Sequence, residues 1–396
     1  MDFRDTPEQA SWRKEIRTFI EENRPTREDA PPGRETLGRD NPAMVKWRGA
    51  LASRGWIAAA WPKEYGGAGL GVMDQFVMNE EFAEARVQNV GGMGTSMIGP
   101  TLIIHGNDEQ KKEHLGRILR GEVVWCQGYS EPGAGSDLAA IQTRAVRDGD
   151  DYVVNGQKIW TSGGHNAKWM ILLARTDPDA PKHRGITYFI VDMKSPGVTV
   201  RPLINAAYTH EFNEVFFEDV RIPKQNIIGE ENRGWYLAQT TLSFERSNIG
   251  GAVGARQTVE DLVKFARGHK GDGQSTLGHN TALRQELVER YVEAGVAQMM
   301  SFKIVSIQAN EGVAPGHEAS VAKLYGTELN QRIQRTGMKM LGLYGQLVAK
   351  SAGPEVPMKG RVEYMYLRSI ANTIEGGTSE IQRNIIATRG LGLPRA

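Results

Sequence analysis

The chain has 396 residues, of which 40% are hydrophobic, and its 48 Lys and Arg residues nearly balance 47 Asp and Glu residues to give a formal net charge of +1. This length and composition are typical of a globular protein of two or three domains, and so small a net charge provides no field to attract nucleic acid or an anionic membrane. A single cysteine, Cys126, excludes an internal disulfide, and no apolar run near the N-terminus reaches the length of a signal peptide or a membrane span. We therefore expect a cytoplasmic protein with no membrane span and no nucleic-acid partner.

Residues 1–122 have the pattern of helices. Thr6, Pro7 and Gln9 fit an N-cap, a first-turn proline and a capping partner. The apolar residues that follow recur at helical spacing, at Trp12, Ile16, Phe19 and Ile20. The same period continues to about Glu122 in "LIIHGNDEQKKEHLGRILRGE". We predict an N-terminal α-helical domain over residues 1–122.

Residues 123–228 change to twofold alternation with turn signals between short runs. The stretch "RAVRDGDDYVVNGQKIW" predicts a strand, an Asp-Gly turn, a strand, a turn at Asn155-Gly156 and a third strand. Further strands are predicted in "WMILLART", "GITYFIVDM", "VTVRPL" and "NEVFFEDVRIP". We predict a middle, mostly antiparallel β-domain over residues 123–228.

Residues 229–396 return to the helical period, as at Leu283, Leu287, Val288, Tyr291 and Val292. The polar, glycine-rich stretch "ARGHKGDGQSTLGHN" predicts an exposed loop within this region. The expected class is therefore α+β, with a helical part, a β part and a second helical part in that order.

Several kinds of catalytic site do not fit the sequence. Eight scattered histidines and one cysteine give no metal-binding spacing. The glycines of "EPGAGSD" lack the third glycine of a dinucleotide fingerprint, and strands follow them instead of a βαβ unit. "GYSEP" has Pro132 where a nucleophile elbow has glycine, which disfavours Ser130 as a nucleophile.

Two loops remain as candidate binding elements. In "WCQGYSEPGAGSD" a strand opens into a loop rich in glycine and small hydroxyls, where backbone N–H groups can approach a polar ligand. An ordinary capped β-turn is the alternative interpretation. In "NGQKIWTSGGHNAKW", Trp160 lies two residues before Ser162 and beside a glycine pair, although an isolated tryptophan is normally a core residue.

Five motifs in order resemble the acyl-CoA dehydrogenase family of flavoenzymes: "YSEPGAGSD", "NGQKIWTSGG", "FNEVFFEDVRIP", "GEENRGW" and "IEGGTSEIQRNIIATRGLG". The resemblance covers nearly the whole chain. It implies an N-terminal helical domain, a middle antiparallel β-domain and a C-terminal four-helix bundle, with FAD between the β-domain and the bundle.

The resemblance also implies the cofactor contacts. Ser130 corresponds to a hydroxyl at the flavin pyrimidine edge, and Trp160 to an indole that flanks the isoalloxazine. Ser162 stands where the family usually has a threonine near flavin N5. The complete set of implied cofactor contacts is Tyr129, Ser130, Gly135, Ser136, Trp160, Ser162, Arg267, Gly342, Thr378 and Glu380.

Other residues of these motifs have further implied roles. Ser136 corresponds to a contact with flavin phosphates or the CoA chain, and so counts also as a substrate contact. Thr378 and Glu380 fall in a segment that meets the FAD of a neighbouring site. Within that segment, Ser379 and Gln382 fit a capping box that begins the last helix.

The family's reaction needs a carboxylate that takes the α proton of the thioester while the β hydrogen passes as hydride to the flavin. The thioester carbonyl must be hydrogen-bonded where enolate charge develops, and the resemblance gives this role to the flavin ribityl hydroxyl and the Gly376 N–H. Most members carry the base in the form E-G-T-S. In this chain the corresponding sequence is E-G-G-T-S, so Gly376 occupies the usual base position and Glu375 lies one residue before it.

A minority of the family, including the isovaleryl and long-chain enzymes, supplies the base from a bundle helix. "TLSFERSNIG" has that form, which favours Glu245 as the base over Glu375, with Arg246 beside it as a substrate contact. The alternative for Glu245 is a solvated side chain paired with Lys or Arg on a helix face.

Two departures concern the cross-subunit half of the FAD site. The family's R-x-x-F-G is replaced by "KFARGHKGDGQSTLGHN", where Arg267 could substitute, and Lys339 stands where a glutamine commonly precedes "MLGLYG". These departures leave the oligomeric state open: the chain could form a homodimer, a homotetramer or a heteromer with a related chain.

The expected activity is the FAD-dependent conversion of an acyl-CoA to its trans-2-enoyl-CoA, with an electron-transferring flavoprotein as the acceptor. Branched or bulky acyl groups are favoured because Gly376 has no side chain to fill the space beside the α carbon. The alternatives are an acyl-CoA oxidase or another flavoenzyme of the same fold, a subunit of a heteromeric acyl-CoA dehydrogenase, and a non-catalytic subunit.

Overall fold

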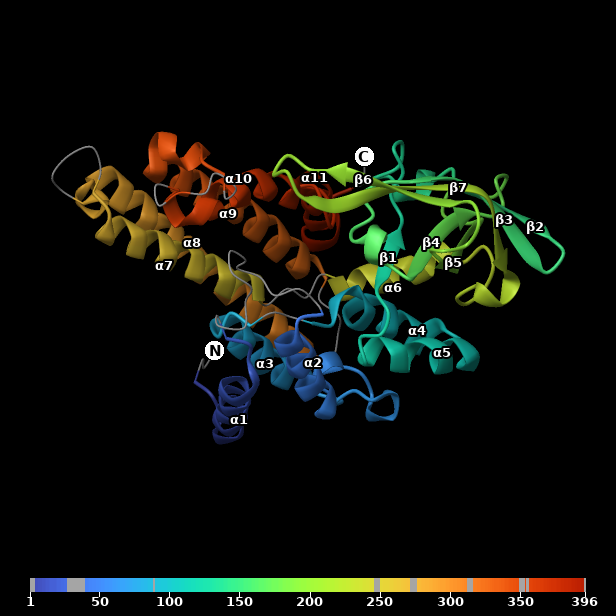
Figure 1. The fold of residues 1–396 in the computed structure, drawn as a ribbon, viewed down its shortest axis with the longest axis horizontal. Helices are drawn as coiled ribbons and strands as arrows, with labels where there is room; N and C mark the ends of the chain where they lie inside the picture. Colours follow the sequence, from blue (N-terminus) through green and yellow to red (C-terminus); the bar gives the residue numbers. More distant parts are fainter. Residues whose placement is uncertain are drawn as a thin grey trace. The chain divides into compact units, whose positions relative to one another are not determined.

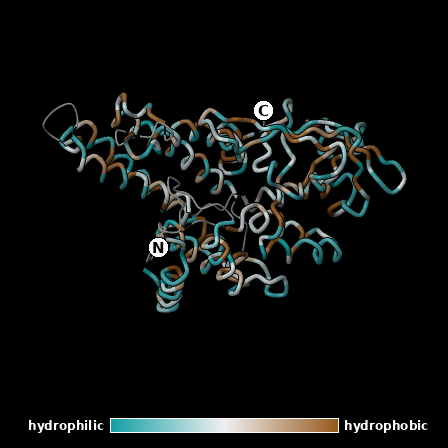
Figure 2. Tube along the Cα trace, in the orientation of Figure 1, coloured by the Kyte–Doolittle hydropathy of each residue, from teal (hydrophilic) through white to brown (hydrophobic). Residues whose placement is uncertain are grey.

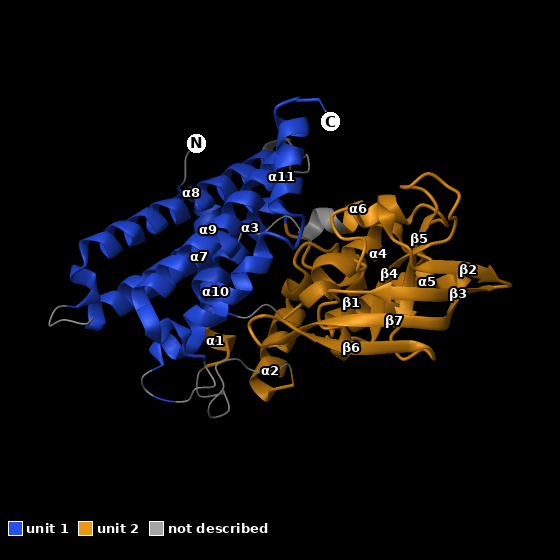
Figure 3. Cartoon of the chain, turned by 90° about the horizontal axis from the view of Figure 1, so that it is seen from above, with its two compact units in different colours: residues 1–20, 71–87, 246–396 blue, residues 21–70, 88–245 orange. Residues whose placement is uncertain are grey.

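The computed structural model describes residues 4–26, 40–87, 90–245, 250–270, 276–311, 316–348, 353 and 356–394. The chain forms two compact units (Figure 3). Unit 1 comprises Met1–Ile20, Gly71–Val87 and Arg246–Ala396, and unit 2 comprises Glu21–Leu70 and Gln88–Glu245. The boundaries at 122/123 and 228/229 stay a prediction.

Unit 1 is helical in its described part. Its helices are α1 (Pro7–Asn23, which runs three residues past the unit's limit), α3 (Val72–Glu84), α7 (Gly250–Gly268), α8 (Thr281–Glu311), α9 (His317–Leu341), α10 (Arg361–Asn372) and α11 (Ser379–Ile385). Helix α9 packs against α7, α8, α10 and α11 (Figure 1). The core between them is apolar and includes Val259, Leu262, Leu329 and Ile333.

Helix α1 begins as its sequence predicts. The Gln9 N–H donates to Thr6 Oγ1 at 3.2 Å, and the Thr6 N–H donates to Gln9 Oε1 at 2.9 Å. These two bonds satisfy backbone donors that a helix start leaves without an intrahelical acceptor. Ile16, Phe19 and Ile20 are buried, so the apolar spacing correctly marked the face that packs inward.

Unit 2 combines helices with one sheet. Its helices are α2 (Pro42–Ser53), α4 (Gly99–His105), α5 (Asp108–Leu119) and α6 (Gly234–Glu245). Its strands are β1 (Trp125–Gly128), β2 (Arg144–Asp148), β3 (Asp151–Lys158), β4 (Trp169–Arg175), β5 (Ile186–Asp192), β6 (Val198–Ile204) and β7 (His210–Pro223).

The helical period through Glu122 is interrupted. Helix α4 ends at His105, and α5 begins after a new N-cap, Asn107. Asn107 Oδ1 accepts from the Gln110 N–H at 2.8 Å, and Gln110 Oε1 accepts from the Asn107 N–H at 3.2 Å. This capping box restarts the helix, because a polar side chain that bonds the backbone competes with continued helical bonding.

The sheet has the order β1-β4-β2-β3-β7-β6, and β5 pairs with β4. The β2–β3, β3–β7, β4–β5 and β6–β7 pairs are antiparallel, whereas β1 and β2 run parallel to β4. Residues 170–174 of β4 and 186–191 of β5 are buried on both faces, as expected for strands covered on each side. The tip of the β2–β3 hairpin, by contrast, is mostly hydrophilic (Figure 2).

The turn predicted at Asn155-Gly156 is wrong. Both residues lie inside β3, which stays paired with β7 through Lys158. The register shifts by one residue here, because β7 contains an extra residue beside Asp219, whose φ is +51°. Asn155 Nδ2 donates to Asp219 Oδ1 at 3.0 Å and Asn155 Oδ1 accepts from the Asp219 N–H at 2.9 Å. The asparagine that indicated a turn therefore braces a β-bulge.

Gly156 provides a test of this bulge. Its φ is +151°, and an added Cβ would lie 2.7 Å from the Thr143 Cα. We expect Gly156→Ala to lower the free energy of unfolding by about 1–3 kcal/mol, because the new methyl clashes with backbone in a strained conformation. Denaturant titration measures the change.

Gly49→Ala is the matched control for Gly156→Ala. Gly49 lies inside α2 with open space around its Cβ position. The same substitution there should raise stability by about 0.5–1 kcal/mol, because alanine is the better helix former. Equal effects at both positions would contradict the structural account of the bulge.

The described helices include none long and apolar enough to cross a membrane. In the described ranges there is likewise no group of three or more His, Cys, Asp or Glu side chains arranged to hold a metal ion.

Candidate active site

In unit 2 the structure brings together the two loops that the sequence singled out. Strand β1 ends at Gly128, and a tight turn follows in which Glu131 and Ala134 exchange backbone hydrogen bonds at 2.9 and 3.0 Å. The Ile159 N–H donates to the Ser130 carbonyl at 2.9 Å. The turn that carries Tyr129 and Ser130 is thus fastened directly to the segment that leads into Trp160.

A buried ion pair lies beneath this turn. Lys158, at the end of β3, has a fully buried side chain whose Nζ donates to Glu131 Oε1 at 2.8 Å and to the Tyr129 carbonyl at 3.0 Å. Glu131 also accepts from the backbone, with the Thr143 N–H on Oε1 at 2.9 Å and the Gln142 N–H on Oε2 at 2.6 Å. Such a pair is stable in a protein interior only where hydrogen bonds satisfy both charges, as they do here.

The electrostatics of the pair keep both partners charged at neutral pH. Burial disfavours the Lys158 ammonium and lowers its pKa to about 8, although Glu131 acts in the opposite direction. Burial acts to raise the pKa of Glu131, but Lys158 and the hydrogen-bond donors outweigh it and leave that pKa below its ordinary value. Separate removal of either partner leaves an uncompensated buried charge.

Trp160 does not lie in the core. Its side chain is 55% exposed and its φ is +60°, a left-handed conformation that a bulky residue rarely adopts. The indole packs edge-on against Phe212, with the ring centroids 5.8 Å apart. A strained backbone that presents a large apolar ring to solvent is typical of a ligand-binding site.

The segment after Trp160 is held by the start of β7. Asn213, fully buried, donates from Nδ2 to the Thr161 carbonyl at 2.9 Å, and its own carbonyl accepts from the Thr161 N–H at 3.0 Å. The Gly163 N–H donates to the Glu211 carbonyl at 2.9 Å. Ser162, which is half-buried, lies between these two anchors.

The other predicted residues of unit 2 are Gly135, Ser136 and Glu245, and Arg246 follows as the first residue of the last segment of unit 1. Gly135 and Ser136 are exposed on the loop after the turn. Helix α6 ends at Glu245, whose side chain is outside the description, and Arg246 lies outside the described residues.

In unit 1, Glu375 forms an ion pair. Arg368 donates from Nη1 to Glu375 Oε1 at 3.2 Å and from Nη2 to Oε2 at 3.1 Å. Asn372 Nδ2 also donates to Oε1. Three donors, all from α10, therefore hold the Glu375 carboxylate toward that helix.

The two glycines that follow have left-handed backbones, with φ of +63° at Gly376 and +90° at Gly377. The capping box predicted at Ser379 and Gln382 is wrong by one residue. The N-cap of α11 is Thr378, whose Oγ1 accepts from the Ile381 N–H at 3.2 Å. Gln382 Nε2 instead donates to the Gly376 carbonyl at 3.2 Å, because the second glycine turns that carbonyl toward it.

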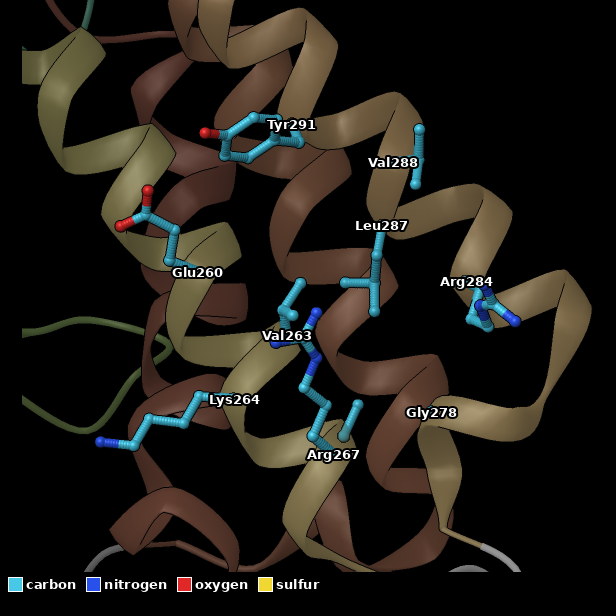
Figure 4. Close-up of a pocket in the computed structure, with 10 residues that line it drawn as sticks. Glu260, Val263, Lys264, Arg267, Gly278, Arg284, Leu287, Val288 and Tyr291 are labelled. Atoms are coloured by element: carbon cyan, nitrogen blue, oxygen red, sulfur yellow. The ribbon is translucent and has the colours of Figure 1, made fainter.

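The remaining predicted contacts of unit 1 stand on three different elements, α11, the end of α9 and α7. Glu380 is exposed in the first turn of α11, and Gly342 caps α9 with φ of +54°. Arg267 lines a pocket of about 590 Å³ between α7 and α8, together with Lys264, Arg284, Leu287 and Tyr291 among others. In Figure 4 the Arg267 side chain extends toward Val263, whereas Lys264 points away.

Sequence reasoning missed the residues that support the site. Lys158 and Glu131 both stand inside quoted motifs, and the available signal was a lysine at the same parity as the apolar residues Tyr152 and Val154 of its strand. The turn predicted at Asn155-Gly156 concealed it, because a chain reversal there removes Lys158 from the strand. Asn213 gave no signal beyond being polar at the inward parity of β7.

Known proteins match the chain from end to end. Descriptions of the acyl-CoA dehydrogenase family match as the N-terminal domain over residues 6–122, the middle domain over 126–220 and the C-terminal domain over 232–391. Acyl-CoA dehydrogenase FadE26 of Mycobacterium tuberculosis is 37% identical over 404 residues, covering 99% of this chain and 98% of the relative. Acyl-CoA dehydrogenase IpdE1 of the same organism is 35% identical over 390 residues, 97% of each chain.

Solved structures also match the chain over its full length. The Tcur3481-Tcur3483 steroid ACAD matches with a TM-score of 0.85 and 34% identity over the full length of both chains. The ChsE4-ChsE5 complex from Mycobacterium tuberculosis matches with a TM-score of 0.83 and 37% identity, again over both full lengths.

The chain belongs to the acyl-CoA dehydrogenase family. It is therefore an oxidoreductase of a flavoprotein class, and its general reaction is the dehydrogenation of acyl-CoA thioesters. The expected family, α+β fold class and enzyme class are confirmed.

Lys158→Met tests the buried pair. The substitution should lower the free energy of unfolding by about 3–5 kcal/mol, because it leaves Glu131 charged and buried without its partner. Denaturant titration measures the loss. Lys168→Met is the control: Lys168 pairs with Asp192 at the surface, so its loss should cost about 0–1 kcal/mol. Similar losses for both variants would contradict the assigned role of Lys158.

The pair also predicts a pH dependence. The pKa of Glu131 in the folded protein lies below the 4.5 of an unperturbed glutamate. Its contribution to stability is therefore fully present above about pH 4.5 and is lost as the pH falls through the lower folded-state pKa. Denaturant titrations between neutral and acidic pH should show a smaller acid loss for Glu131→Gln than for the wild type. Parallel curves would refute the assignment.

Proposed function

We propose that this chain catalyses the FAD-dependent α,β-dehydrogenation of an acyl-CoA to its trans-2-enoyl-CoA, with Glu245 as the base. The observation that carries the proposal is the Trp160 indole. It is exposed on a strained backbone beside the Ser130 turn, and the buried Lys158–Glu131 pair fixes that turn. A flat aromatic cofactor accounts for both the exposure and the strain.

The chemistry of the donor set fits FAD. Ser130 and Ser162 offer hydroxyls on two segments joined by the Ile159–Ser130 backbone bond, and Trp160 stands on the second of these segments. In the described part of the chain, Thr161 Oγ1 and Ser379 Oγ are buried without hydrogen-bond partners. Both belong to segments for which the family resemblance implies cofactor binding, and polar atoms are seldom left unsatisfied without a reason.

The chain's own groups have distinct roles in the proposed reaction. Bound FAD supplies the acceptor for the hydride that leaves the β carbon. Glu245 takes the α proton as a carboxylate held at the end of α6. The Gly376 N–H donates to the thioester carbonyl oxygen, where negative charge develops as that proton leaves. Arg246 and Ser136 contact the CoA part of the substrate.

The ion pair at Glu375 supports Glu245 over Glu375. The Arg368 guanidinium makes a two-point contact with Glu375, and such bidentate pairs are among the stronger charged interactions. To act as the base, Glu375 would have to leave these donors.

Glu245→Gln tests the assignment of the base. We expect the rate of flavin reduction by acyl-CoA to fall by at least about 10³-fold, because the amide cannot take the α proton. Stopped-flow absorbance under anaerobic conditions measures the rate, and the flavin band of the purified variant shows whether cofactor is retained.

Glu375→Gln is the control for that experiment, and it should keep the rate within about tenfold of the wild type. If Glu375→Gln abolishes reduction while Glu245→Gln does not, the base is Glu375. A wild-type rate for Glu245→Gln with full flavin content would reject Glu245 outright.

We propose bulky acyl groups, including steroid-derived thioesters, as substrates. Gly376 and Gly377 place no side chain at the usual base position, and a solved structure with 34% identity is named a steroid ACAD. The test is the visible spectrum of the protein, recorded anaerobically with short, branched, long and steroid-derived acyl-CoA. Bleaching by the bulky classes is expected, and bleaching by short straight chains alone would overturn this specificity.

We also propose that the chain acts in an oligomer, as a homodimer or homotetramer or with a related chain, and passes electrons to an electron-transferring flavoprotein. Arg267 and Arg284 place two cations on one pocket, which suits the pyrophosphate of a partner's FAD. Two structural relatives carry the names of two-component assemblies. Native mass spectrometry with a flavin-to-chain ratio tests this, and a catalytically active monomer would refute it.

A further inference from the structure

A chain of buried hydroxyls runs through unit 2. Tyr129 Oη lies 2.6 Å from Tyr188 Oη, which lies 3.3 Å from Thr241 Oγ1, which lies 2.8 Å from Thr101 Oγ1. All four side chains are buried, and three of them have no measurable exposure. The residues come from four separate elements: the turn after β1, strand β5, helix α6 and helix α4.

The proton order along the chain follows from its end. Thr101 Oγ1 donates to the Met97 carbonyl at 2.8 Å, and a hydroxyl has only one proton. Thr101 therefore accepts from Thr241, which uses its one proton for this 2.8 Å bond in preference to the Leu237 carbonyl at 3.4 Å. Thr241 then accepts from Tyr188, and Tyr188 accepts from Tyr129. Tyr188, Thr241 and Thr101 then each donate once and accept once along one direction, an arrangement in which the bonds strengthen one another.

The two ends of this chain lie beside the two halves of the proposed chemistry. Tyr129 begins the chain with its side chain, while its carbonyl is held by Lys158, and Ser130 is the next residue. Next to the other end, Thr101, stands Thr241, which lies one helical turn before Glu245 on α6, so Thr241 and Glu245 belong to the same helix face.

A second contact fixes α6 in the same place. His105 Nε2, one turn after Thr101 on α4, lies 3.2 Å from Thr240 Oγ1. Adjacent threonines of α6 thus meet successive turns of α4. Sliding or rotation of α6 would break both contacts and leave buried hydroxyls without partners.

We propose that the buried hydroxyl chain Tyr129–Tyr188–Thr241–Thr101 is a positioning device, which fixes α6 and hence Glu245 relative to the Tyr129–Ser130 turn. The inference rests on the proposed function, because it assumes that Glu245 is the base. Thr241 and Tyr188 are positioning residues and touch neither substrate nor cofactor in this proposal.

The test compares two substitutions at Thr241. Thr241→Val keeps the shape but removes the hydroxyl, whereas Thr241→Ser keeps the hydroxyl and removes a methyl. We expect Thr241→Val to slow anaerobic flavin reduction by about 10- to 100-fold, since small misplacements of a catalytic group have effects of that size. The substrate concentration for half-maximal rate should change less than threefold. Thr241→Ser should stay within about threefold of the wild type.

Tyr188→Phe provides an independent variant. It removes the preceding hydroxyl of the same chain and should reproduce the slow rate of Thr241→Val. Because both act on one chain, the double variant should lose little more than the slower single variant. Thr336→Val is the control for loss of a buried hydroxyl elsewhere, on α9, and should leave the rate unchanged.

The outcomes separate this inference from the function on which it rests. If Glu245→Gln abolishes reduction but Thr241→Val and Tyr188→Phe react normally, the positioning role is wrong and the base assignment stands. Equal slowing by Thr241→Val and Thr241→Ser would mean that packing matters and the hydroxyl does not, which also overturns the role. If Glu245→Gln reacts at the wild-type rate, both proposals fail.

Discussion

The Lys158–Glu131 pair is the interaction on which the site in unit 2 depends. Two opposite charges without solvent around them are costly to bury, and the cost is offset only because each charge has several hydrogen-bond partners. Those partners are backbone groups of the turn after β1 and of the residues before β2. These backbone groups must keep their positions, because any movement would leave one of the two buried charges without a hydrogen-bond partner.

Much of the rest can be understood from that requirement. The turn holds Ser130, whose carbonyl receives the Ile159 N–H, and the chain then enters the left-handed conformation at Trp160. Strain of this kind persists only where the surroundings determine it more than once. The conformation at Trp160 is constrained before it by Lys158 and after it by Asn213, which makes two hydrogen bonds to Thr161.

The sequence predicts the elements better than their junctions. Ile16, Phe19 and Ile20 mark the buried face of α1 because helical spacing is a property of many residues together. A turn or a cap rests on one or two residues, so neighbouring interactions can override it. Asn155-Gly156 has the residues of a turn, but the pairing of β3 with β7 continues through it. Thr378 displaces Ser379 as a cap because the preceding glycines set the start of α11 one residue earlier.

The residues of the candidate site also differ in how far the sequence predicts them. Trp160 and Ser130 could be named from motifs, whereas nothing in "GITYFIVDM" distinguishes Tyr188 from a core aromatic residue. Its significance depends on Tyr129 and Thr241, which are distant in sequence and meet it only in the folded chain.

The glycine pair at 376 and 377 has an evolutionary consequence. Both residues take positive φ in a connection between helices, where one residue more or less alters no pattern of buried faces. The same slip within β4 would send every core side chain to the opposite face. An acid carried on such a connection can shift out of register without disturbing the helices on either side, and in this chain the acid there, Glu375, is paired with Arg368. Under the proposed assignment of Glu245 as the base, the fold would carry the proton acceptor on a helix in place of this connection, with the same architecture.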